Sequence, residues 1–207
     1  MHTTIFRVRL RTLAFILFYR QFYRTKVTGS LSDCGLAKYN GNNHPKDKFK
    51  QTFNSMKKLQ FKLSIKAPAR RIYDFMLGIN NKSTYEQWTA LFNPTSTYEG
   101  SWDKGAKILF VGVDEKGEKG GMVSRIAENI PNRFVSIQHY GLLQAGKEIT
   151  EGPEVEKWAN GLENYTFEEN NGTTNVTVDL DTVEDFVEYM NEHYPKALDK
   201  LKEICEN

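Results

Sequence analysis

Cysteine is scarce in this sequence: Cys34 and Cys205 are the only two among 207 residues. A disulfide framework needs several paired cysteines, so a disulfide-stabilised fold is excluded. Two free thiols fit a reducing compartment, and we expect a cytoplasmic protein.

Histidine is also scarce, and the four histidines are scattered. His2, His44, His139 and His193 show no spacing that would bring ligands to one metal ion. Phosphate-binding loops and nucleophile elbows are absent as well. The sequence therefore predicts no metal, no cofactor and no catalytic residue, and we expect a protein that is not an enzyme.

No apolar run is long enough to favour membrane insertion. Residues 13–19 are apolar, but a helix that spans a bilayer needs about 20 such residues, and basic residues lie on both sides of this run. A convincing secretion signal is also absent, because the apolar core is short and no small-residue cleavage site follows it. We expect no stable membrane insertion.

Acidic residues are nearly missing from residues 1–55, which contain ten Lys or Arg but only Asp33 and Asp47 as acids. This basic segment superficially resembles an organelle transit peptide, and a targeting or membrane-surface role is one interpretation. The other is that the segment is translated upstream sequence ahead of a start at Met56, where the first patterned strand begins. We predict two parts, a basic segment 1–55, disordered or not native, and a folded domain 56–207.

The remainder of the chain has more acids than bases, because the basic excess lies in residues 1–55. Binding to a nucleic acid backbone depends largely on Lys and Arg that neutralise phosphates. We expect no nucleic acid partner for the domain.

From Met56 onward the patterns are regular. Residues 57–66 alternate apolar and polar side chains as in a half-buried strand, and two short helices follow over 69–78 and 83–93. Turn residues then separate further strands, with a long connection over 142–155. The expected strands are 98–102, 107–113, 122–128, 133–140, 164–169 and 174–180.

The C-terminal segment 182–206 predicts a long amphipathic helix with one wide apolar face. Pro195 lies inside it and predicts a kink or a short break near residues 193–194. The apolar face consists of Val183, Phe186, Val187, Met190, Tyr194, Ala197, Leu198, Leu201, Ile204 and Cys205.

This order of elements predicts an α+β helix-grip fold. A curved antiparallel sheet of about six strands wraps around the long C-terminal helix, with two short helices after the first strand. A space between such a sheet and its helix commonly forms a ligand cavity.

Particular residues add a family resemblance over about 57–206. Ala67-Pro68 opens the first helix, Trp88–Leu91 is followed by Asn93-Pro94, and Trp102 is followed by Gly105. Further matches are Ile72, Tyr73 and Phe75, the strand with Gly121, Val123 and Ile126, and the ending with Tyr194, Pro195, Lys196, Ala197, Leu198, Leu201 and Lys202.

These residues resemble the START-like (birch-pollen-allergen-like, SRPBCC) superfamily, in its branch of heat-shock-protein ATPase activator homologues. That branch usually has Gly-Trp where Tyr194-Pro195 stands here. The resemblance implies a hydrophobic cavity, with members that range from carriers through cyclases to chaperone regulators, so fold does not fix function.

The strand 133–140 leaves two interpretations open. If Phe134 points inward, Ser136, Gln138 and Tyr140 do so too; if Val135 and Ile137 point inward, His139 does. A lone strand histidine is more often structural than catalytic, and Trp88 on its helix fits ordinary core packing. Our predicted ligand-binding cavity consists of Phe110, Ser136, Gln138, Tyr140, Trp158, Tyr165, Phe186, Met190 and Tyr194.

The leading hypothesis is a binding protein whose cavity takes a small apolar or amphipathic ligand. A different hypothesis is a protein-interaction module that regulates a chaperone ATPase through its outer surface, with a chaperone-like protein partner. A third is an enzyme of cyclase or hydrolase type that acts within the cavity.

Overall fold

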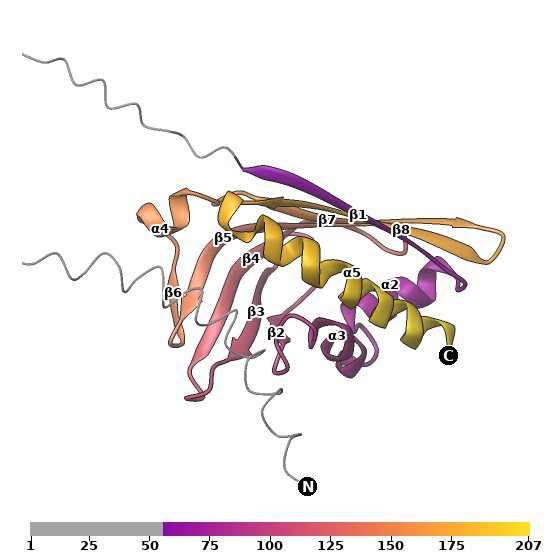
Figure 1. The fold of residues 1–207 in the computed structure, drawn as a ribbon, viewed down its shortest axis with the longest axis horizontal. Helices are drawn as coiled ribbons and strands as arrows, with labels where there is room; N and C mark the ends of the chain where they lie inside the picture. Colours follow the sequence, from indigo (N-terminus) through magenta and orange to yellow (C-terminus); the bar gives the residue numbers. More distant parts are fainter. Residues whose placement is uncertain (1–55) are drawn as a thin grey trace, which may run out of the picture. The chain divides into compact units, whose positions relative to one another are not determined.

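The computed structural model describes residues 56–207. The expected basic segment 1–55 lies outside them. The described chain forms an antiparallel sheet and a long C-terminal helix, with two shorter helices between its first two strands (Figure 1). This is the helix-grip arrangement that the order of elements predicts.

Eight strands make up the sheet, in the order β1-β8-β7-β5-β4-β3-β2, with β6 paired to β5 outside this path. All neighbouring strands are antiparallel. Their bounds are β1 Lys57–Ile65, β2 Thr97–Gly100, β3 Lys107–Val113, β4 Lys119–Ile130, β5 Phe134–Gln144, β6 Lys147–Ile149, β7 Leu162–Asn170 and β8 Thr173–Thr182.

One face of the sheet, called the inner face below, carries the core side chains. In the β1–β8 pair, Phe61 lies opposite Val178 and Leu63 opposite Val176. Val178 in turn lies opposite Tyr165 on β7, which pairs with Val135 on β5. Since directly paired residues of antiparallel strands point to the same side, the alternation in the sequence becomes one continuous apolar surface.

Two helices follow β1. α2 (Ala69–Leu77) ends at Gly78, whose left-handed φ of 66° suits a residue without Cβ. α3 (Lys82–Thr89) begins after Asn81, whose side chain accepts a hydrogen bond from the Ser83 backbone N–H. The short loop turns the second helix back so that the two pack together.

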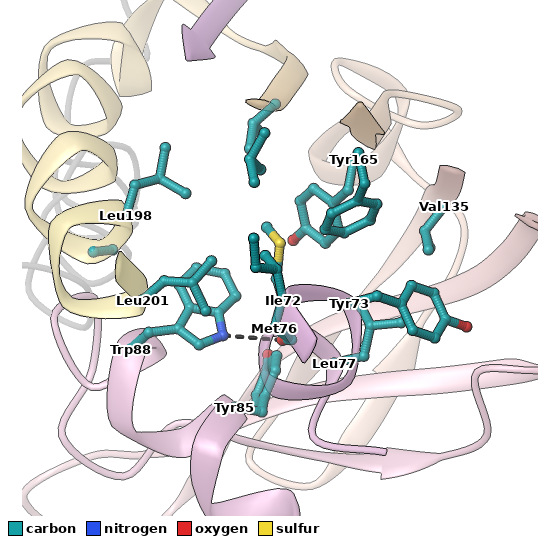
Figure 2. Packing of buried hydrophobic residues seen from close by; sticks show 14 of the residues in the cluster. Ile72, Tyr73, Met76, Leu77, Tyr85, Trp88, Val135, Tyr165, Leu198 and Leu201 are labelled. Carbon is teal, nitrogen blue, oxygen red and sulfur yellow. Dashed lines mark hydrogen bonds between the residues drawn. The ribbon is translucent and has the colours of Figure 1, made fainter. Parts of the chain in front are cut away.

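The long helix α5 (Glu184–Glu206) packs on β1, α2 and α3. Figure 2 shows Leu198 and Leu201 of α5 facing Trp88 of α3, whose indole Nε1 donates to the Met76 carbonyl at 2.9 Å. Trp88 is thus a core residue with a satisfied polar atom, as packing predicts.

Pro195 lies inside α5, and the helix runs through it without the predicted short break. Pro195 is exposed, and so is Asn191, whose carbonyl would accept the missing hydrogen bond, so the loss falls on the exposed side of the helix. All fully buried side chains of α5 lie from Tyr194 onward: Tyr194, Ala197, Leu198, Leu201 and Cys205.

The predicted long connection 142–155 is more regular than expected. β5 continues to Gln144, turns through Ala145 and Gly146, and pairs with β6; the short helix α4 (Pro153–Glu156) follows. The sheet therefore has eight strands rather than about six. Within residues 56–207, no helix combines the length and the apolar character that crossing a membrane would require.

Candidate functional site

A carboxylate on the inner face is the centre of a buried polar network. Glu163 on β7 pairs with Ile137 on one side and Leu180 on the other, so it points toward α5. Its side chain is 15% exposed. Tyr165 donates its phenolic hydrogen to Glu163 Oε1 at 2.6 Å, and Tyr194 of α5 donates to the same oxygen.

The second carboxylate oxygen faces an imidazole. His139 Nε2 lies 3.3 Å from Glu163 Oε2, and His139 Nδ1 lies 2.8 Å from Ser124 Oγ. A carboxylate only accepts hydrogen bonds, so His139 donates from Nε2 to Glu163, and its Nδ1 shares a hydrogen bond with the Ser124 hydroxyl. The network thus runs from β4 through β5 and β7 to α5.

The network determines the charge of Glu163. Burial by itself raises the pKa of a carboxyl group, but the hydrogen bonds and the charge of His139, with those of Tyr165 and Tyr194, outweigh it and lower the pKa of Glu163. Burial and the Glu163 charge together hold the pKa of both tyrosines well above its usual value. At neutral pH the site therefore contains an anion among neutral phenols.

Ser124, His139 and Glu163 form a hydrogen-bonded chain of the kind in which a serine nucleophile, a histidine base and an acidic residue follow one another. Ser124, however, has no exposed surface, and its hydroxyl is held against the imidazole between β3 and β5. A nucleophile must reach its substrate. The arrangement orients His139 toward Glu163 and does not present an accessible serine.

Apolar side chains next to the network are only partly covered. Phe110 on β3 has its ring centroid 6.2 Å from that of His139 and is half-buried, as are Phe186 and Met190 in the first half of α5. α5 packs on β1, α2 and α3; among the described elements no comparable packing joins it to β3, β4 or β5. The packing of α5 is thus concentrated on β1, α2 and α3, and Phe110 is the inward side chain of β3 that stays half-buried.

The structure brings several of the predicted cavity residues together. Tyr165 and Tyr194 share the Glu163 carboxylate, and Phe110 lies beside its partner His139. Met190 packs against the same core, and Phe186 lies one turn before it on α5. Trp158 is half-buried just after α4, in the segment that leads to β7.

Ser136, Gln138 and Tyr140 lie on the opposite, outer face. Ser136 pairs with Asn164, and Gln138 Oε1 accepts from the exposed Arg125 at 2.5 Å. Of the two interpretations of this strand, the structure has the one in which Val135, Ile137 and His139 point inward. A β-bulge leaves Tyr140 without a partner on β4 and packs it with the separate outer cluster Val111, Val123, Leu143 and Leu109.

Glu163 and Ser124 are absent from the predicted site. Glu163 lies two residues before Tyr165 and hence has its inward parity, but it precedes the predicted start of that strand, Asn164. A strand one residue longer would have placed a carboxylate inside. Among residues 56–207, no group of three or more His, Cys, Asp or Glu side chains could hold a metal ion.

A pocket of about 280 Å³ lies elsewhere, on the surface of α2. Its lining residues include Arg70, Arg71 and Asp74, and the Asp74 carboxylate accepts hydrogen bonds from Asn80. None of its residues belongs to the Glu163 network, so this pocket is separate from the site.

No family model matches the sequence, and no curated protein matches it. Solved structures do resemble its fold. Protein MLL2253 from Mesorhizobium loti superposes with a TM-score of 0.52 at 11% identity, over 72% of this chain and 96% of that one. The Aha1 dimer from Colwellia psychrerythraea gives 0.51 at 21% identity, over 73% and 97%.

DynU16, described as a putative protein in the dynemicin biosynthetic locus, gives a TM-score of 0.51 at 14% identity, over 72% of this chain and 47% of that one. At such identities a likeness shows the fold alone. The chain shares its fold with these proteins, and this fold is the helix-grip arrangement that the sequence resemblance implies.

Proposed function

We propose that this protein binds a small amphipathic molecule between the first half of α5 and the inner face of β3, β4 and β5. The observation that carries the proposal is the buried Glu163 carboxylate, whose partner His139 packs against the half-buried ring of Phe110. Met190, one turn before Tyr194 on α5, is half-buried as well. Ligand sites typically combine an apolar wall with a few fixed polar groups, and this combination is present here. The fold, in which sheet and helix enclose such spaces, supports the same proposal.

The experiment is a thermal-stability screen with fatty acids, sterols, flavonoids and isoprenoids. A ligand that binds only the folded state, present at a hundred times its Kd, adds about 2.7 kcal/mol of stability. We expect a subset of the panel to raise Tm by several degrees. No shift with any compound, together with no bound small molecule in native mass spectra of fresh protein, would overturn the proposal.

A substitution identifies the place of binding. Met190→Trp adds volume at a half-buried position of α5, and we expect it to abolish the ligand-induced shift while the protein stays folded. Ile79→Trp is the matched control. Ile79 is 46% exposed, so this substitution introduces the same indole ring outside the inner face. A shift that survives Met190→Trp would place the ligand elsewhere.

A second candidate is a protein-interaction module of the chaperone-ATPase-regulator kind. The likeness to the Aha1 dimer at 21% identity favours it, as does the acidic excess of residues 56–207. Such a module acts through its outer surface, so Met190→Trp would leave partner binding intact. The measurement is the ATPase rate of a heat-shock chaperone with and without added protein, for wild type and for this variant.

A further inference from the structure

Trp102 has a buried hydrogen-bond donor without a protein acceptor. Trp102 is 5% exposed, and its indole Nε1 makes no hydrogen bond to any of the described residues. Trp88 shows the usual situation, since its own Nε1 donates to the Met76 carbonyl. Buried polar groups are nearly always paired, so an unpaired indole N–H indicates an acceptor that the protein does not itself supply.

This indole lies in the wall of the proposed binding region. Its ring centroid is 5.7 Å from that of Phe110, 5.4 Å from Tyr98 and 6.3 Å from Tyr85. The Asn129 side chain fixes its backbone by donating to the Trp102 carbonyl at 2.7 Å. Phe110 contacts both Trp102 and His139, so one half-buried ring connects the free donor to the Glu163 network.

The charge of the region is negative. Glu163 is ionised, and after burial its charge is the main cause that raises the pKa of Tyr85, the neighbour of Trp102. Among residues 56–207, the buried polar side chains include Ser, Thr and His139 but no Lys or Arg. His139 is already paired with Glu163, and the exposed Lys82, which lies over the Tyr98 ring, already donates to the Tyr98 carbonyl. An anionic ligand group would therefore lose its water shell next to the Glu163 carboxylate without a buried cation of its own, which is unfavourable.

From these two observations we infer the chemistry of the ligand: an apolar body that carries an uncharged carbonyl-type oxygen, which accepts the Trp102 Nε1 hydrogen, and no carboxylate. This inference rests on the proposed function and specifies the chemical class of the ligand. An oxygen acceptor in the aromatic wall satisfies the free donor, while Glu163 excludes the oxidised, anionic counterpart of the same molecule. The site thus selects ketones or esters against acids of equal size.

Three probes of one shape test the inference at pH 8: 2-acetylnaphthalene, 2-ethylnaphthalene and 2-naphthoate. We expect the ketone to bind about tenfold more tightly than the hydrocarbon, since one hydrogen bond contributes about that factor, and the carboxylate to bind most weakly. Affinities are measured by isothermal titration calorimetry with the full chain.

Trp102→Phe keeps an aromatic ring and removes the donor. We expect it to lower the ketone affinity to that of 2-ethylnaphthalene and to leave the hydrocarbon affinity unchanged. Trp88→Phe is the matched control, because it removes an indole N–H that the Met76 carbonyl already satisfies, and it should keep the preference for the ketone. A ketone preference that survives Trp102→Phe would overturn the inference, and a trapped water would then be the acceptor.

Glu163→Gln tests the charge without touching Trp102. We expect this variant to bind 2-naphthoate more tightly relative to the ketone than wild type does. Wild-type protein that binds naphthoate as well as the ketone would overturn the exclusion of acids, with the proposed function still standing. If no probe binds and the wider panel also gives no shift, the proposed function itself fails.

Discussion

Tyr165 on the sheet and Tyr194 on α5 donate hydrogen bonds to the same atom, Oε1 of Glu163. The helix is thus joined to the sheet through one buried carboxylate, in addition to its apolar contacts. Tyr194 is also fixed from the side, because it stacks on Phe61 with ring centroids 4.7 Å apart. Groups that share a partner do not contribute independently to stability.

The shared oxygen makes the two tyrosines energetically coupled. Tyr165→Phe and Tyr194→Phe should each destabilise the fold by about 1–3 kcal/mol, because each removes a hydrogen bond to a buried anion. The double variant should differ from the sum of the two by at least about 0.5 kcal/mol in urea unfolding. Tyr140→Phe, on the outer face, serves as the control and should change stability by less than about 0.5 kcal/mol. Strict additivity would contradict the shared acceptor.

Glu163 should make stability depend on acid pH. Its folded-state pKa is lower than that of an unfolded glutamate, about 4.3, so its contribution is fully present above that pH and declines as the pH falls through the folded-state pKa. The free-energy difference between wild type and Glu163→Gln should therefore be largest near neutral pH and shrink below about pH 4. Unfolding in urea at several pH values measures it. A difference that grows toward acid pH would mean that the pKa is raised instead.

The apolar face of α5 can be tested by two neighbouring substitutions. Leu198 is 2% exposed, and Leu198→Ala should cost about 2–5 kcal/mol through the cavity that it leaves. Lys200 pairs with Glu203 near the helix surface, and Lys200→Ala should cost less than about 0.5 kcal/mol. Equal losses of Tm in the two variants would show that the helix face is assigned incorrectly.

Gly121 occupies a position that no other residue can fill without rearrangement. Its φ is +149°, and a Cβ there would lie 1.9 Å from the Phe110 carbonyl oxygen on β3. Gly121→Ala should therefore lower stability by more than about 2 kcal/mol, since backbone must move. Gly120→Ala is the neighbouring control, because its Cβ would meet the nearest atom at an ordinary 3.6 Å. Thermal unfolding of the two variants measures the difference, and equal Tm values would contradict the close approach at Gly121.

The sequence predicts most of the fold because its strands are half-buried and its long helix is amphipathic. Residues 58–65 alternate strictly, and the apolar face of 184–206 is continuous, so both elements can be predicted from periodicity. β6 and α4 are not predicted, because three and four residues are too few to show a period. Pro195 predicts a break that does not occur, because packing of the residues after it holds the helix together.

The site is harder to predict than the fold. β5 carries apolar residues on both faces, so the sequence does not show which of its residues point inward. In addition, the bulge at Tyr140 exchanges the inward and outward positions partway along the strand. The Glu163 carboxylate can be buried only because Tyr165, Tyr194 and His139 donate hydrogen bonds to it, and these residues lie on three different elements. No local pattern reports such a long-range arrangement.

Pro195 divides α5 into two halves that differ in how deeply their side chains are buried. The proline has no backbone N–H, so the carbonyl of Asn191 lacks its helical partner, and no side chain of 184–193 is fully buried. We expect amide hydrogen exchange to differ accordingly: residues 197–205 exchange only when the whole domain unfolds, whereas 184–193 exchange faster, through local opening. Mass-detected exchange of peptides from the two halves measures this. One continuous helix would then contain two opening units, and the weaker one is the half that carries Phe186 and Met190.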